Sequence, residues 1–216
     1  LDQQGLLTSM VTGDLPLAIN NAQATNAIRN ITPYLNLANV LGSTLVRVMI
    51  HDASDLPNVQ RSADIAKERG VKLCQQIHWG SLFETTSEAL SIIKAVNRPN
   101  FGVTYEPANL LACGETPSPD NLRRLFPHLF NFYFQNIKLD ANSPVTFNTR
   151  KNGSVGVRFL PISSRDGIDM RPLTTTLREL GYDDWFTIHQ PLLTAQTVQD
   201  VIRQSSEFIS NHFEKL

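Results

Sequence analysis

Hydrophobic runs and amphipathic segments alternate along the chain, which is the pattern of strands followed by helices. The run Thr44–Ile50 is β-branched and apolar, as is typical of a buried strand in a parallel sheet. The next segment, Leu56–Arg69, has helical character and ends at Gly70. By the same pattern, further strands are predicted at Leu6–Thr12, Val71–His78, Phe101–Tyr105, Phe130–Leu139, Val155–Ile162 and Trp185–His189.

Several predicted helices carry end signals. The helix Thr25–Leu41 stops at Gly42, a favourable residue just beyond a helix, and Pro33 inside it predicts a kink or a break. Thr85 and Glu88 have the spacing of a capping box that opens the following helix. Further helices are predicted around Asp120–Phe126, from Pro172 (as a first helical residue) to Leu180, and over Thr194–Phe213.

The order of these elements predicts an α/β fold with a parallel sheet and right-handed crossovers. About seven strands are expected, and a polar connection, Ser143–Ser154, stands where another helix would fall. A complete (β/α)8 TIM barrel needs about 250 residues. Because the chain has 216 residues and begins at Leu1, we expect one TIM barrel domain over residues 1–216 that lacks its first βα unit. A doubly wound open sheet is the alternative, but the chain has no glycine-rich phosphate turn.

Composition and charge narrow the partners. The 19 basic and 20 acidic residues give a net charge of −1, which argues against a nucleic-acid or anionic membrane surface. The sequence has no stretch of about 18 apolar residues, so no membrane span is predicted. Cys74 and Cys113 lie far apart in sequence and predict free thiols in a reducing, cytoplasmic compartment. A barrel with open sheet edges would need a second chain or a swapped element, so a homo-oligomer is also expected.

Polar side chains follow the apolar part of several predicted strands. In a TIM barrel, chemistry is located where strands end and βα loops begin. Burying such groups without partners costs about 1–3 kcal/mol each, so their recurrence at the same relative place predicts one polar, sugar-sized site. The residues concerned are Arg47 and His51, Gln75–Trp79, Tyr105–Asn109, Gln135–Lys138, and His189–Gln190.

The same segments carry a family resemblance. In chain order they are Val71–His78, ending in Gln-Ile-His, then Pro99–Asn109, Phe134–Lys138, Asp166–Asp169, and Leu177 through Trp185 to His189. They resemble the E-x-H strand, the P-N-x-G-x-x-x-D-x-x-H/N segment, the H-x-H-x-K strand and the closing G-x-x-D … L-x-x-x-G-Y-x-G-x-x-x-x-E run of the sugar phosphate isomerase/epimerase family. These are the xylose-isomerase-like TIM barrels, and the resemblance covers nearly the whole chain.

The resemblance implies a metal-dependent enzyme, from which this sequence departs. The family holds one divalent ion, often Mn²⁺, Mg²⁺, Co²⁺ or Zn²⁺, with Glu, Asp, His and Glu, and its two glutamates move a proton beside the sugar carbonyl. The matching positions here are Gln76, Glu106, Asn136 and His189. A hard cation prefers several anionic oxygens. We therefore expect any metal to be weakly held, by Glu106 and His189.

The same positions lead to an expected set of site residues. An amide cannot exchange a proton near neutral pH, but an imidazole titrates close to pH 7. Glu106 and His189 are therefore predicted as the proton-handling pair, with Lys138 as their electrophilic partner. Substrate hydrogen bonds and ring contacts are expected from Gln76, His78, Trp79, Asn109, Gln135, Asn136 and Gln190.

Two functions from different classes follow. The first is an isomerase- or epimerase-type enzyme that acts on a small polyol or keto-sugar by proton abstraction. The second is a barrel that has kept the pocket and lost turnover, and so binds a sugar or polyol without converting it. A metal-dependent nuclease on the same fold is disfavoured, because it would need a metal cluster rich in His, Asp and Glu and a basic groove, whereas the chain has five histidines and a net charge of −1.

Overall fold

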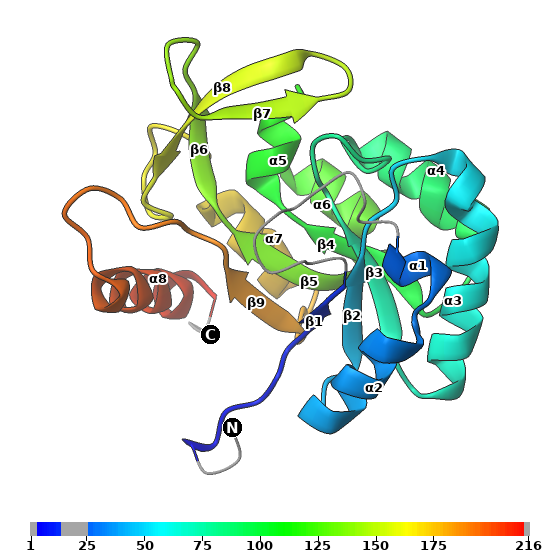
Figure 1. The fold of residues 1–216 in the computed structure, drawn as a ribbon. Helices are drawn as coiled ribbons and strands as arrows, with labels where there is room; N and C mark the ends of the chain where they lie inside the picture. Colours follow the sequence, from blue (N-terminus) through cyan, green and yellow to red (C-terminus); the bar gives the residue numbers. More distant parts are fainter. Residues whose placement is uncertain (1–3, 14–25, 214–216) are drawn as a thin grey trace.

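A curled parallel sheet forms the centre of the molecule. The computed structural model describes residues 4–13 and 26–213. Six strands pair in the order β1-β2-β3-β4-β5-β9, and every pairing is parallel (Figure 1). The strands are β1 (Val11–Thr12), β2 (Leu45–Val48), β3 (Lys72–Gln76), β4 (Phe101–Tyr105), β5 (Leu129–Phe134) and β9 (Trp185–Ile188). This confirms an α/β barrel that is incomplete in this chain, since a full barrel has eight strands.

Helices cover the outer face of this sheet. They are α1 (Asn26–Arg29), α2 (Thr32–Leu41), α3 (Leu56–Glu68), α4 (Thr86–Val96), α5 (Pro107–Ala112), α6 (Pro119–Leu125), α7 (Arg171–Glu179) and α8 (Val198–His212), with short 3₁₀ turns η2 (Ala53–Asp55) and η3 (Phe126–His128). The expected break near Pro33 is present, since α1 ends at Arg29 and α2 starts at Thr32. Gly42 ends α2 with φ of 68°, a left-handed conformation that suits glycine. Helix α5 was not expected; it begins at Pro107, with only Glu106 between it and β4.

The capping predictions for two helices are confirmed in substance. The Thr85 side chain accepts a hydrogen bond from the Glu88 amide at the start of α4. Pro172 lies in the first turn of α7, one residue after the first helical residue, Arg171. The last helix is shorter than predicted, because Thr197 caps α8 through the Asp200 amide and so fixes its start.

Three strands form a separate antiparallel sheet, and here the sequence prediction was wrong. Its order is β6-β8-β7, with β6 (Asn136–Leu139), β7 (Thr146–Thr149) and β8 (Gly153–Leu160). Val155–Ile162 was expected as a barrel strand, but β8 pairs antiparallel with both neighbours. Ser143–Ser154 was expected as a plain connection, but it contains β7 and the turn into β8. The antiparallel sheet extends from one end of the parallel sheet (Figure 1).

The run Phe130–Leu139 is two strands rather than one. Phe134 pairs with Ile188 in the parallel sheet, whereas Asn136 pairs with Leu160 in the antiparallel sheet. Gln135 is the residue between them. The chain changes its partner there without a turn, so the hydrophobic pattern alone shows no boundary.

Alternation along the strands separates an apolar outer face from a polar inner face. The outer side chains of β5, Phe132 and Phe134, contact one another and the helical layer through Phe208 of α8. The inner face holds polar and sulfur groups in contact across strands. Thr104 lies against Cys74 (3.3 Å), and Asn131 hydrogen-bonds Thr187 (3.1 Å). A largely polar interior is unusual for a packed barrel, whose inner layers are typically aliphatic.

Candidate active site at the strand ends

Gln76, Glu106 and His189 come together at the carboxyl ends of β3, β4 and β9. Gln76 is the last residue of β3, Glu106 directly follows β4, and His189 directly follows β9. Because side chains alternate along a strand, these residues continue the inner face that Cys74, Thr104 and Thr187 begin. The preceding Gln75 points the other way, where it accepts a hydrogen bond from the Ile50 amide (2.7 Å).

Glu106 is the centre of this cluster. Its side chain has no exposed surface. Oε2 accepts hydrogen bonds from the amide of Gln76 and from the amide of Asn109 (2.5 Å), and Oε1 accepts one from His189 (2.8 Å). Hydrogen bonds of this kind hold a buried carboxylate in one fixed position. Asn109 also donates to the Ile77 carbonyl (2.9 Å), so its amide is already fully used and supports Glu106.

His189 has one nitrogen fixed and one side open. A carboxylate only accepts hydrogen bonds, so Nδ1 carries the proton in this contact and Nε2 is the atom left for acid–base exchange. The His189 side chain is 50% exposed, in contrast to its partner. Desolvation lowers the pKa of His189, but the charge of Glu106 and its hydrogen bond together outweigh that effect, so the pKa lies above its ordinary value.

A cavity of about 270 Å³ lies beside His189. It is lined by Gln135, Phe159, Ile188, His189, Gln190 and Pro191. Three of these residues were predicted for the site, and the volume is on the scale of a small polar metabolite. Phe159 comes from β8, so the antiparallel sheet supplies one wall of the cavity.

Gln135 and Gln190 fix the rim of this cavity. The Gln135 amide donates to the His189 carbonyl (2.6 Å), which holds the backbone that carries the imidazole. The Gln190 side-chain oxygen accepts a hydrogen bond from the backbone N–H of Asn136 (3.2 Å). Its side-chain nitrogen is buried and has no hydrogen-bond partner within the described part of the chain. That nitrogen is therefore able to donate to a ligand in the cavity.

His78 and Trp79 lie on the loop after β3. His78 is buried, and its Nδ1 donates to the Trp79 carbonyl (2.7 Å). Burial lowers the pKa of His78 to about 4, so the ring is neutral near pH 7. Trp79 stacks on Phe147 of β7, with ring centroids 5.7 Å apart. Trp79 therefore joins this loop to the antiparallel sheet.

Asn136 and Lys138 do not join the cluster. The side-chain nitrogen of Asn136 donates to the backbone carbonyls of Pro161, Ser164 and Ile168. Its side-chain oxygen accepts a hydrogen bond from the backbone N–H of Ile168 (2.8 Å). Asn136 therefore fixes the loop before α7, and the expected convergence of four residues holds for three. Lys138 lies on β6 opposite Arg158. It makes no hydrogen bond or ion pair with Glu106 or His189 in the described ranges.

Arg47 was predicted among the strand-end polar residues but without a role, and Tyr133 was not predicted for the site. Arg47 is 7% exposed, and its Nη1 donates to Gln76 Oε1. The Tyr133 ring lies 5.0 Å from the His189 ring, centroid to centroid. A signal existed for each. Arg47 is a lone charge inside an apolar strand, and Tyr133 lies two residues before Gln135 and so shares its face. Phe159 had no such signal, because its position depends on the pairing of β8.

The donor set does not fit a divalent cation. The residues that the structure describes contain no group of three His, Cys, Asp or Glu side chains placed to hold a metal. Gln76 Oε1 and both oxygens of Glu106, which an ion would need as ligands, already accept hydrogen bonds. The Arg47 guanidinium adds a positive charge on Gln76 that would repel the ion. The contacts therefore do not support the weak metal expected at Glu106 and His189.

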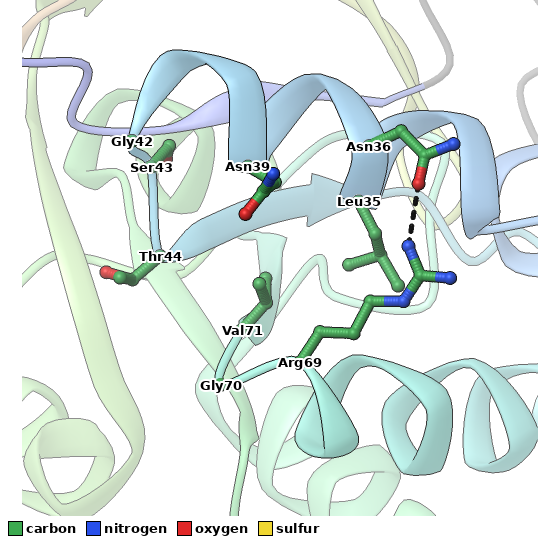
Figure 2. Close-up of a pocket in the computed structure, with 9 residues that line it drawn as sticks. All are labelled: Leu35, Asn36, Asn39, Gly42, Ser43, Thr44, Arg69, Gly70 and Val71. Carbon is green, nitrogen blue, oxygen red and sulfur yellow. Dashed lines mark hydrogen bonds between the residues drawn. The ribbon is translucent and has the colours of Figure 1, made fainter.

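A larger hollow of about 470 Å³ lies at the opposite end of the strands (Figure 2). Its lining includes Gly42–Thr44, just before β2, and Gly70 and Val71, just before β3. Arg69 spans it by donating to Asn36 (2.7 Å). In TIM barrels the chemistry is located at the carboxyl ends of the strands, whereas this hollow lies at their amino ends. We therefore place the candidate site at the carboxyl ends.

The fold and the cluster define the class of protein first: a parallel (β/α) barrel with a buried carboxylate paired to an imidazole at the carboxyl ends of its strands. The chain belongs to the xylose isomerase-like TIM barrel family, whose model matches residues 2–212. This confirms the family predicted from the strand-end motifs.

Solved structures share the fold at low sequence identity. A xylose isomerase domain protein from Planctomyces limnophilus superposes with a TM-score of 0.73 at 16% identity, covering 97% of this chain and 78% of that chain. A xylose isomerase-like TIM barrel protein from Mycobacterium smegmatis in complex with magnesium gives 0.68 at 17%, covering 97% and 74%. A D-psicose 3-epimerase, in the presence of D-fructose, gives 0.59 at 15%, covering 98% and 78%. At these identities the likeness concerns the fold alone.

No curated protein sequence matches the chain. Of the helices that the structure describes, none has the length and apolar character needed to span a bilayer.

Proposed function

We propose that this protein is an isomerase-type enzyme that acts on a small polyol or keto-sugar by proton abstraction, taking the proton from the carbon beside a carbonyl group and returning it to the carbonyl carbon. The observation that carries the proposal is the contact between His189 and Glu106, 2.8 Å long, with the carboxylate fully buried and the imidazole half exposed at a cavity. Sugar-acting relatives with the same fold support the substrate class.

The two residues have different roles. His189 is the group that exchanges a proton with the substrate, through Nε2. Glu106 has no exposed surface and its oxygens accept three hydrogen bonds. It therefore positions the imidazole, fixes its tautomer and stabilises the imidazolium that forms.

A single exchanging group favours isomerisation over epimerisation. Removing a proton and returning it to the neighbouring carbon on the same face needs one acid–base residue. Inverting a stereocentre needs a second one on the opposite face, and Gln76 cannot fill that role because an amide does not titrate near neutral pH. Lys138 lies outside the cluster, on β6.

The test is exchange of substrate protons with solvent. A panel of ketoses and aldoses, from trioses to hexoses, is incubated with the protein in D₂O. Incorporation of deuterium at the carbon beside the carbonyl is followed by NMR. We expect incorporation with the native chain and at least about a 100-fold loss in His189→Gln, the range for a removed acid–base group. His212→Gln, a histidine on α8, is the matched control and should retain full activity.

The alternative is a barrel that binds a sugar without converting it, and the amide at Gln76 is the observation that favours this reading. A protein that shows no exchange on any sugar, yet whose melting temperature rises with one of them, would establish the binder and refute the enzyme. Exchange that survives in His189→Gln would remove His189 from the mechanism.

A further inference from the structure

Arg47 is a buried cation that contacts no opposite charge among the residues that the structure describes. Its side chain lies in β2, its residue is 7% exposed, and it forms no ion pair within the described ranges. Its Nη1 donates a hydrogen bond to Oε1 of Gln76, and the Gln76 side chain is a neutral amide. Taking a guanidinium out of water without an anion is costly, so such an arrangement is retained where an anionic partner arrives from outside.

One edge of the guanidinium is unused. Arginine has five N–H donors in a planar fork, and the Nε and Nη2 edge matches the two oxygens of a carboxylate or a similar oxygen pair. Nη1 is bonded to Gln76. Nε is buried and has no hydrogen-bond partner in the described part of the chain. Residues 4–13 and 26–213 hold no hydrogen-bond partner for Nη2 either, since the guanidinium donates there through Nη1 alone, so the Nε and Nη2 edge has no partner among these residues.

The open edge belongs to the same network as the exchanging imidazole. Arg47 donates to Gln76, Gln76 donates to Glu106, and His189 donates to the other oxygen of Glu106. The guanidinium and the imidazole are thus tied to opposite sides of one carboxylate. Glu106 is the anion of this network and already accepts three hydrogen bonds. Arg47 is the arginine of the network, and its guanidinium is therefore the group that can bind negatively charged oxygens of a substrate.

We propose that Arg47 binds an oxygen pair of the substrate through its Nε and Nη2 edge and takes the place of a divalent cation in this barrel. This inference rests on the proposed function for its catalytic part and on the contacts of Arg47 for its binding part. In the reaction, His189 removes a proton from the carbon beside the carbonyl, and the bonding electrons move onto the carbonyl oxygen. Arg47 stabilises the two oxygens of the resulting enediolate. The proton on His189 returns to the former carbonyl carbon, and the hydroxyl proton passes from one enediolate oxygen to the other, which leaves the carbonyl on the neighbouring carbon. No oxidant or reductant is needed.

The binding part is tested with an anion and its neutral counterpart. The probes are D-erythronate, which carries a carboxylate, and erythritol, the matched uncharged polyol. Affinities are measured by isothermal titration calorimetry on protein dialysed against EDTA. We expect erythronate to bind at least about tenfold more tightly than erythritol, the scale of one charged hydrogen-bonded pair.

Two variants and one control assign the effect to Arg47. Arg47→Gln should remove the preference for erythronate. Arg47→Lys, which keeps the charge without the fork, should retain a part of it. Arg124→Gln, an exposed arginine on α6, should bind both probes as the native chain does. Circular dichroism of each variant shows whether it is folded, and Arg47→Lys still decides the question if Arg47→Gln is not.

Each outcome is decisive. Erythronate binding that is unchanged in both Arg47 variants, or that requires added Mg²⁺ or Mn²⁺, overturns the inference. Proton exchange that is lost in EDTA and restored by a metal overturns its catalytic part while leaving the proposed function intact. Arg47-dependent binding of erythronate without exchange on any sugar refutes the proposed function and leaves the anion site standing.

Discussion

At the scale of single residues, one contact decides most of the chemistry. Glu106 lies between β4 and α5 and is fully buried, where a negative charge would be costly without donors. The amides of Gln76 and Asn109 and the ring of His189 supply them. The result is an imidazole with a fixed tautomer and a raised pKa at the edge of a cavity.

This contact predicts the pH dependence of the exchange reaction. The base is neutral His189, whose pKa lies above the ordinary value, so kcat/KM should rise with pH through a midpoint above about 6.5. Glu106→Gln removes the charge that raises this pKa while burial still lowers it. The midpoint should therefore move to lower pH, and the plateau should fall at least about tenfold. The measurement is the pH profile of deuterium incorporation.

Glu207→Gln is the control for this experiment. Glu207 lies on α8 with its side chain 59% exposed, so its substitution should leave the profile unchanged. A midpoint that stays in place in Glu106→Gln would mean that another group limits the reaction.

At the scale of elements, the change from β5 to β6 organises the site. The chain leaves the parallel sheet at Gln135 and enters the antiparallel sheet at Asn136. Gln135 then faces His189, whereas Asn136 faces the loop of residues 161–168. Neighbouring amides in one sequence run thus have different tasks, one at the cavity and one in the scaffold.

Asn136→Ala should therefore act on stability. It removes one acceptor and leaves three backbone carbonyls, one of them in a fully buried contact, without their donor. Each lost bond of this type costs about 1 kcal/mol, so we expect the free energy of unfolding to fall by roughly 2–4 kcal/mol in urea denaturation. Asn142→Ala, in an exposed turn, should change it by less than about 0.5 kcal/mol. A variant of native stability with weakened sugar binding would return Asn136 to the substrate site.

At the scale of the whole molecule, the parallel sheet and its helices form one core, and the antiparallel sheet packs onto their loops. Arg150, in the turn between β7 and β8, donates its amide to the buried carboxylate of Glu84 (2.6 Å). Asn152 donates to the Cys113 carbonyl (3.3 Å). The cavity wall at Phe159 is therefore held by contacts far from it in sequence.

The two cysteines report on this core. Both are free, as the sequence predicted, and both are buried. Burial raises the pKa of Cys74 to about 11 and also raises that of Cys113, so neither forms a reactive thiolate near pH 7. We expect Cys74, in the middle of the sheet, to react with a thiol reagent only through global unfolding. Cys113, beside the antiparallel sheet, should react through smaller openings and therefore faster.

Labelling of the Cys74→Ala and Cys113→Ala variants separates the two thiols. Rates measured over increasing urea should converge near the unfolding transition. Fast labelling of Cys74 in the absence of urea would show that the sheet opens locally around β3, in conflict with a single core.

The sequence by itself determined the parallel barrel and the places where polar groups would gather. Both follow from local patterns, because period and end signals fix the strands, and parallel strands direct their carboxyl ends to one side. Only the tertiary structure decided that Arg47 joins Gln76, that Asn136 and Lys138 leave the cluster, and that β8 lines the cavity. Those outcomes depend on strand pairing between distant segments, which no local pattern records.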